Sequence, residues 1–246
     1  MVSDGRVHIL IDAGISARRI TTGLRALGVE LRQVAGILIT HEHSDHISGL
    51  RVLCRQIGAE IYTAEPTARQ ICYRTAGLEE RFRVFDPGER FAIGGLTVGS
   101  FATSHDCACP VGFMVSDGKR KLTLCTDTGT VTQGALDAVR GADTLIGEFN
   151  YDLEMLRAGP YPAYLKERIL GGQGHLSNEL GGELAGRAVE QGTRRVVLAH
   201  LSKENNRPEK ALAAARQTME RIGARVGTDV ELFAAPRDTC SGWFEV

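Results

Sequence analysis

The decisive stretch of this sequence is ILITHEHSDHISGL, residues 37 to 50. An apolar, strand-like run over Val34–Thr40 leads into three histidines and two acids within six residues. Imidazole nitrogens and carboxylate oxygens are the usual ligands of zinc and similar divalent ions. A solvated polar loop is the alternative interpretation, and one histidine alone would favour it. The four candidate ligands at this spacing predict a metal site instead: His41, His43, Asp45 and His46.

Three more candidate ligands each follow an apolar run further along the chain. His105 follows VGSFATS, Asp127 follows LTLCT and His200 follows RVVLA. Side chains at the C-terminal ends of strands converge on one edge of a sheet, where α/β proteins build their sites. Each residue alone could be an ordinary loop residue, but together they can complete two coordination shells. Asp12, at the end of another apolar run, is a candidate to hold a ligand histidine by its second ring nitrogen.

The pattern along the chain predicts a single α/β domain over residues 1–246, with a β-rich middle and helices towards either end. Expected helices include Ser48–Gln56 and Ser177–Gln191. Short β segments occupy the region from Arg81 to Leu124, and Asp117-Gly118 is a typical hairpin turn. Such a chain can form two mixed β-sheets with helices on the outside.

Composition restricts the functional classes. The 246 residues are 43% apolar and 24% charged, which is ordinary for a globular protein with a sizeable core. A net charge of -1 excludes the bulk basic surface of a DNA coat protein, although not a local basic strip. The chain has no run near the ~20 apolar residues of a membrane span, and Met1–Asp12 lacks the apolar core of a secretory signal. We therefore expect a cytoplasmic protein, not bound to membranes, whose six cysteines are reduced.

Several blocks of this sequence resemble the metallo-β-lactamase superfamily, and more closely its bacterial YycJ/WalJ subgroup. The general signature is H-x-H-x-D-H, followed by His, Asp and His ligands in the same order as here. More specific blocks extend over nearly the whole chain: LIDAGIS (10–16), ILITHEHSDHISGL (37–50), ATSHD (102–106), TDTG (126–129), GPYPAYLKERILGGQGHLSN (159–178) and LAHLSKENNRP (198–208).

The resemblance implies a fold, a metal centre and an activity. The implied fold is an αββα sandwich, and the implied activity is phosphodiester hydrolysis by a nuclease, an exonuclease acting on DNA. Zinc or manganese would be the ion, with iron as a third candidate. The implied ligands form one set at His41, His43 and His105 and a second at Asp45, His46 and His200, with Asp127 as the bridge.

The chemistry of such a centre suggests further roles. Two divalent ions about 3.5–4 Å apart can hold a hydroxide and stabilise the attacking and leaving oxygens. We expect Asp45 to orient the attacking water or accept its proton. His175, in GQGHLSN, is expected to protonate the leaving alkoxide, although it could simply cap the helix that follows. Lys203 could equally be a solvated loop lysine. The expected substrate contacts are Ser177, Asn178, Lys203 and Asn205.

Two departures from the family pattern leave other functions open. Only Met1–Arg6 precede the first apolar run, so the opening strand of related chains is expected to be missing. Tyr151 stands where the family has a histidine. One alternative is a hydrolase of small esters, thioesters, lactones or cyclic phosphodiesters on the same metals. Another is a catalytically impaired protein that binds metal and nucleic acid. The oligomeric state is not predicted by the sequence.

Overall fold

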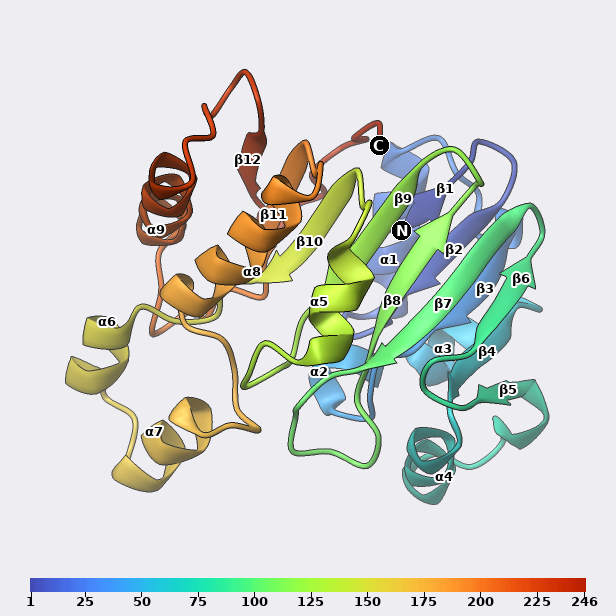
Figure 1. Cartoon of the computed structure of the whole chain (residues 1–246). Coiled ribbons are helices and arrows are strands. Elements are labelled where there is room, and N and C mark those ends of the chain that lie inside the picture. The colour runs from blue at the N-terminus through green and yellow to red at the C-terminus, as the bar shows by residue number, and fades with distance from the viewer.

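The computed structural model describes residues 1–246 and places two β-sheets face to face (Figure 1). Strands β2 to β5 of the first sheet are parallel, and β1 is antiparallel to β2. The first sheet contains, in spatial order, β1 (Val2–Ser3), β2 (His8–Ile11), β3 (Val34–Leu38), β4 (Glu60–Ala64) and β5 (Phe82–Phe85).

The second sheet is antiparallel from β6 to β9 and parallel from β9 to β12. Its turn between β8 and β9 is the predicted Asp117-Gly118 hairpin, with Gly118 at φ +89°. Its strands in chain order are β6 (Arg90–Ile93), β7 (Leu96–Ala102), β8 (Val111–Ser116), β9 (Lys121–Cys125), β10 (Thr144–Glu148), β11 (Arg195–Ala199) and β12 (Glu231–Ala234).

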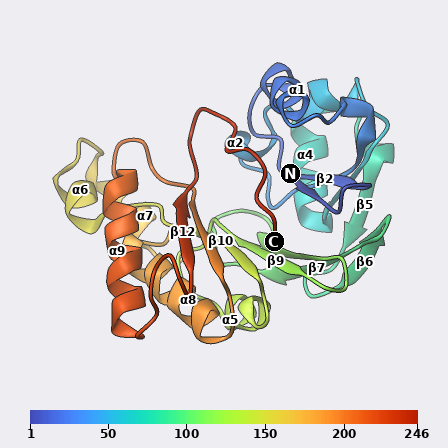
Figure 2. The ribbon, with the colours of Figure 1, turned by 90° about the horizontal axis from the view of Figure 1, so that it is seen from above.

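Helices cover the outer faces of both sheets, and Figure 2 shows α1 beyond the first sheet and α5 and α8 beyond the second. The pair α6 and α7 stands apart from these layers at one end of the molecule (Figure 1). The helices are α1 (Ala17–Ala26), α2 (Ser44–Ile47), α3 (Leu50–Cys54), α4 (Glu65–Arg74), α5 (Gln133–Val139), α6 (Leu153–Ala158), α7 (Ala163–Leu170), α8 (Asn178–Glu190) and α9 (Pro208–Arg221), with 3-10 turns at Leu31–Gln33 and Glu79–Arg81.

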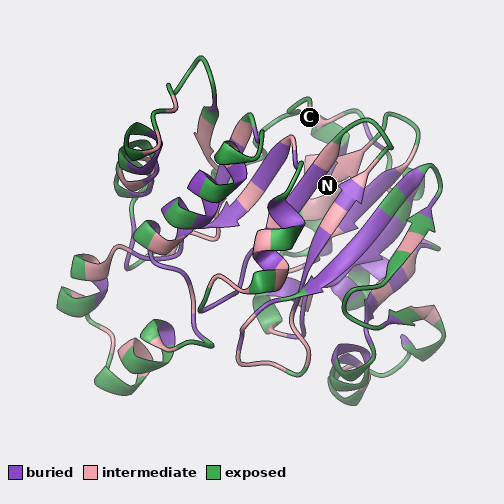
Figure 3. Cartoon of the chain, viewed as in Figure 1, coloured by how far each residue is buried: buried purple, intermediate pink, exposed green.

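Alternation along the strands builds the core in layers. In β2 and β3, Ile9 and Leu38 face the second sheet and pack against residues such as Phe113. Their neighbours Leu10 and Ile37 face the opposite way, into the cluster that includes the helix residues of α1 and α3. A third cluster lies between the second sheet and α5, α8 and α9. The central strands of both sheets are accordingly buried along most of their length, whereas the edge strands β5, β6 and β12 are largely exposed or half-buried (Figure 3).

The structure corrects two expectations about local structure. The edge of the first sheet is not bare, because Val2–Ser3 pairs with β2 as a two-residue strand. The predicted helix Ser48–Gln56 is present but shorter, as α3, and the additional helix α2 precedes it across Ser48 and Gly49. The backbone N–H of Gly49 donates to the carbonyl of Ala13 at 2.8 Å instead of continuing α2, and a Cβ at Gly49 would overlap the carbonyl oxygen of Ile15. As a result, two predicted metal ligands lie on a short helix instead of in a loop.

Candidate metal centre

All seven predicted ligands lie at one edge of the two sheets. His41 and His43 follow β3, while Asp45 and His46 belong to α2, which begins directly after His43. The second sheet contributes the rest, because β7, β9 and β11 run in the same direction and end at this edge. The residues from the second sheet are His105, Asp127 and His200, each just beyond the end of its strand.

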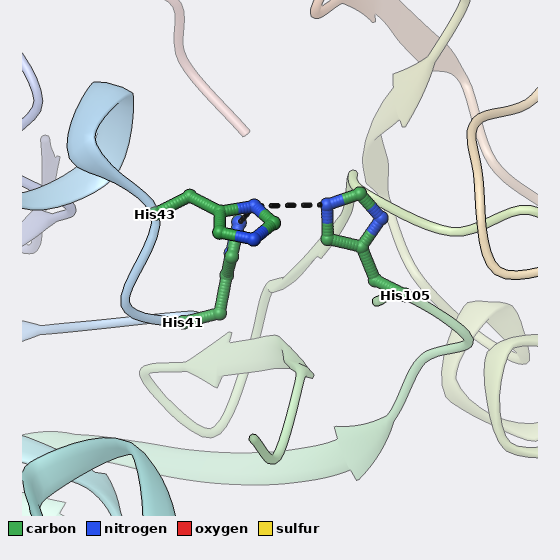
Figure 4. A group of neighbouring side chains, drawn as sticks. All are labelled: His41, His43 and His105. Carbon is green, nitrogen blue, oxygen red and sulfur yellow. Dashed lines mark hydrogen bonds between the residues drawn. The ribbon is translucent and has the colours of Figure 1, made fainter. Parts of the chain in front are cut away.

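The first ligand group consists of three imidazoles that converge on one point (Figure 4). Nε2 of His41 lies 3.1 Å from Nδ1 of His43, which lies 3.2 Å from Nε2 of His105. Tetrahedral zinc with bonds of 2.0–2.1 Å separates its ligand atoms by about 3.3 Å. The nitrogen spacing therefore fits one tetrahedral ion, and the three residues would supply three of its ligands.

The second group is joined to the first through Asp127. Asp45, His46 and His200 offer ligand atoms within 4.8 Å of one another. Oδ1 of Asp127 lies 3.5 Å from Nε2 of both His46 and His200 and 4.0 Å from Nε2 of His105. Its Oδ2 is buried without a hydrogen-bond partner. Because a buried unpaired carboxylate oxygen is costly, this orphaned atom fits a residue that binds a cation.

Outer carboxylates hold the ligand histidines by their other ring nitrogens. Asp12 accepts a hydrogen bond from Nδ1 of His46 at 2.8 Å and another from the backbone N–H of Thr40 at 2.9 Å. Nδ1 of His105 donates to the carbonyl of Gly174 at 2.9 Å. These bonds leave Nε2 of each ring free to bind a metal. Asp12 thus lies where its position after β2 predicted.

Glu148 is the residue of this site that the sequence interpretation missed. Its side chain is fully buried, and its Oε1 accepts from Nδ1 of both His175 (2.7 Å) and His200 (2.8 Å). Oε2 accepts from the backbone N–H groups of Thr128 (3.0 Å) and Leu176 (3.2 Å). Glu148 ends β10 at the same sheet edge as the ligands. A polar residue at the end of an apolar strand was the pattern that indicated Asp127 and His200, and Glu148 has the same position at the end of β10.

Backbone strain is concentrated at the same edge. Asp12, Asp127 and His200 have φ of 59°, 56° and 57°, and they are the non-glycine residues with positive φ in the chain. Each left-handed residue costs on the order of 1–3 kcal/mol. The three strands end in the same way, with a sharp turn that aims the side chain into the site, so the strain is tied to the geometry of the metal centre.

The site is anionic enough to retain protons when no cation is present. Burial lowers the pKa of His46, but the carboxylates of Asp12 and Asp127 outweigh it and raise this pKa to about 11. Burial likewise opposes a proton on His200, whose pKa Asp127 and Glu148 raise to about 9. By contrast, burial and the charge of His46 lower the pKa of His41 to about 2. A divalent ion would replace the two protons and satisfy the same carboxylates.

A groove of about 890 Å³ opens above the ligands. His175 and Lys203, two of the predicted functional residues, line it together with Asp45. The His175 side chain is one-fifth exposed, and it does not cap α8, because Ser177 takes that position. The groove therefore has room for a substrate directly beside His175.

The other predicted substrate contacts lie inside the protein. Ser177 is buried and accepts a hydrogen bond from the backbone N–H of Leu180, which makes it the N-cap of α8. Asn178 is buried and exchanges hydrogen bonds with Asn206 at 2.8 and 3.0 Å. Asn205 is 1% exposed. These side chains do not reach the groove, so we assign structural roles to Ser177, Asn178 and Asn205.

Tyr151 is also a structural residue here. Its side chain is buried in a small apolar cluster with Leu156 and Ile169, beneath α6 and α7. The phenol therefore packs against this pair of helices and does not line the groove. The departure from the family at this position leaves the metal ligands and their outer partners in place.

Comparisons with known proteins agree with this geometry. A family model described as "Beta-lactamase superfamily domain" matches residues 8–201. The chain is 36% identical over 226 residues to exodeoxyribonuclease YycJ of Bacillus anthracis, covering 91% of this chain and 85% of that protein. It is 35% identical over 241 residues to exodeoxyribonuclease WalJ of Streptococcus pneumoniae, covering 97% and 90%.

The fold also has counterparts among solved structures. The metallo-β-lactamase fold protein YhfI from Bacillus subtilis matches with a TM-score of 0.69 at 19% identity, covering 98% of this chain and 88% of that one. The predicted αββα sandwich is thereby confirmed. No helix in the structure combines the length and the apolar character needed to cross a bilayer.

Proposed function

Because this chain belongs to the metallo-β-lactamase superfamily, in its YycJ/WalJ-like subgroup, it is a metal-dependent hydrolase, and we propose that it degrades DNA from an end using two divalent ions. The observation that carries the proposal is the pair of ligand groups joined by Asp127, with its orphaned buried oxygen. Relatives named as exodeoxyribonucleases support DNA as the substrate. Zinc and manganese are the preferred candidates, with iron third, because all three accept imidazole and carboxylate ligands.

Bound ions would supply Lewis acidity, both to activate water and to stabilise charge on the phosphate oxygens. The remaining steps belong to side chains. The Asp45 carboxylate is two-thirds exposed and lies 3.8 Å from Nε2 of His46, where it can orient the attacking water and accept its proton. Because Nδ1 of His175 donates to Glu148, the proton for the leaving oxygen would come from Nε2 of the imidazolium, which leaves a neutral ring with its hydrogen on Nδ1.

The six cysteines support the proposal of a cytoplasmic protein. None is paired in the structure, as a reducing compartment would maintain them. A hydrolase of small esters, thioesters, lactones or cyclic phosphodiesters remains the second candidate. The specific observation in its favour is that the groove is not lined by a net positive charge.

The test is degradation of end-labelled single- and double-stranded DNA by metal-free protein reloaded with manganese or zinc, beside Asp127→Ala. We expect metal-dependent loss of linear DNA, survival of closed circular DNA, and no cleavage by the variant. Cleavage of circles would exclude an exonuclease. If the protein binds about two ions per chain but cleaves no DNA, the small-molecule hydrolase is favoured. Bis-p-nitrophenyl phosphate and a thioester would then distinguish a phosphodiesterase from a thioesterase. If the metal-bound protein cleaves none of these substrates, the alternative that is left is a catalytically impaired protein that binds nucleic acid.

A further inference from the structure

We propose that Arg168 binds a backbone phosphate next to the one being cleaved and so determines the preference for a polynucleotide over a small diester. This inference rests on the proposed nuclease function and adds a substrate contact to it. Arg168 lies on α7, in the helix pair that stands out from the body of the molecule (Figure 1). With Tyr161 and Leu165 it forms the wall of the groove on that side.

The guanidinium of Arg168 is held in a defined orientation. Its Nε and Nη2 both donate to the carboxylate of Asp106, the latter at 3.1 Å. Asp106 directly follows the ligand His105 in the chain. A guanidinium has five N–H groups in a planar fork, so three remain for another acceptor. The side chain is half exposed and needs little reorganisation to bind a phosphate oxygen.

The position of Arg168 relative to the metal ligands is also set by its surroundings. After α7, the loop Gly171–Gly174 accepts hydrogen bonds from Ser104 at the Gly172 carbonyl (2.7 Å) and from His105 at the Gly174 carbonyl (2.9 Å). A Cβ at Gly129 would overlap the backbone of this loop. Because the loop is packed so closely, a phosphate bound by Arg168 would lie at a constant separation from the one at the metal centre.

The charges that line the groove make a single cationic contact important. Four cations and four carboxylates line the groove, so its walls provide no general basic track. Arg168 is the one of these cations that is oriented by a carboxylate next to a metal ligand in the chain, whereas Arg19 contacts Asp238 and Arg237 donates to the carbonyl of Leu201. Lys203 is the remaining cation. A groove of about 890 Å³ is in the size range of sites for drug-sized ligands, which suits a single strand of one or two nucleotides rather than a duplex.

The experiment compares Arg168→Ala with wild-type protein and with Lys166→Ala. Lys166 lies on the same helix but does not line the groove, and its Nζ donates to the carbonyl of Arg157. Binding is measured by fluorescence anisotropy with a labelled phosphorothioate single strand that resists cleavage, at one salt concentration. Steady-state kinetics are measured with cleavable DNA and with bis-p-nitrophenyl phosphate, which has no neighbouring phosphate. Metal content is measured for all three proteins.

We expect Arg168→Ala to weaken strand binding and raise the KM for DNA by about tenfold or more, the effect of losing a hydrogen bond to a charged group. Its kinetics on bis-p-nitrophenyl phosphate and its metal content should stay at the wild-type level, as should all properties of Lys166→Ala. Equal losses on both substrates would mean that Arg168 only positions the His105 loop, which overturns the inference. Unchanged DNA binding would overturn it as well. A wild-type protein that neither binds nor cleaves DNA would instead show that the proposed function itself is wrong.

Discussion

Replacing Glu148 with glutamine is the most informative perturbation of this site. The side chain keeps its shape, but one carboxylate oxygen, which accepts hydrogen bonds, is replaced by an NH2 group, which donates them. In the wild-type protein each carboxylate oxygen accepts two hydrogen bonds, from two imidazoles at Oε1 and from two backbone N–H groups at Oε2. The side chain is fully buried, so water cannot compensate. An amide has one acceptor and one donor end, and each of its two orientations fails differently.

If the amide oxygen faces the imidazoles, the NH2 group abuts the N–H groups of Thr128 and Leu176. Each orphaned buried donor costs about 1–3 kcal/mol, so the free energy of unfolding should fall by about 2–6 kcal/mol. If the amide is flipped, its NH2 donates to Nδ1 of His200, and a neutral ring then carries its hydrogen on Nε2. That is the nitrogen 3.5 Å from Asp127, and a protonated nitrogen cannot bind a metal.

The assay combines urea denaturation of the metal-free protein with competition titration against a chromophoric zinc chelator. We expect either the stated loss of stability or a loss of zinc affinity of about 10–100-fold, the usual consequence of removing an outer partner of a ligand histidine. Glu190→Gln is the matched control. Its carboxylate is 44% exposed and forms a surface pair with Arg187, which is worth less than about 1 kcal/mol. A Glu148→Gln protein with wild-type stability and wild-type zinc affinity would refute this account.

Three further outcomes are expected. The folded pKa of His200, about 9, lies above its ordinary 6.5. Its proton therefore stabilises the metal-free protein fully below pH 6.5, and that contribution is lost as the pH rises through 9. An ion bound by His46 and His200 must displace this proton and also the proton of His46, whose pKa is about 11, so apparent zinc affinity should rise about a hundredfold per pH unit from pH 6.5 to 9. Calorimetry in buffers of different ionisation enthalpy measures the proton release, and a flat affinity would contradict the assignment. A Cβ at Gly14 would overlap the carbonyl oxygen of Asp45, so Gly14→Ala should displace α2 and lower metal content, whereas Gly58→Ala, where a Cβ meets open space, should not. The His175→Ala protein should keep its metal, but its kcat on DNA should fall by about 10²–10⁴-fold. Its kcat on bis-p-nitrophenyl phosphate should fall much less, because p-nitrophenolate leaves without a proton. Equal losses of kcat on the two substrates would show that His175 is not the proton donor.

The local sequence determined which residues would meet at the candidate metal centre. His41, His43, Asp45 and His46 are contiguous, so their proximity needs no knowledge of the fold. His105, Asp127 and His200 were found because an apolar run predicts a strand, and strand ends share an edge. The positions of the strands followed for the same reason, since short apolar runs are typical of strands that are buried along most of their length, such as β3 and β11.

Only the tertiary structure decided what surrounds those ligands. Glu148 and His175 are 27 residues apart, and Arg168 and Asp106 are 62 apart. Pairs of this kind depend on how separate loops pack, which no local periodicity encodes. Burial of a single polar side chain is equally non-local. Asn178 and Asn205 look like functional residues in the sequence, yet both are buried, and Asn178 is hydrogen-bonded to Asn206. Identity of the ligands is therefore a property of short segments, whereas their orientation, proton partners and substrate contacts arise from packing between distant ones.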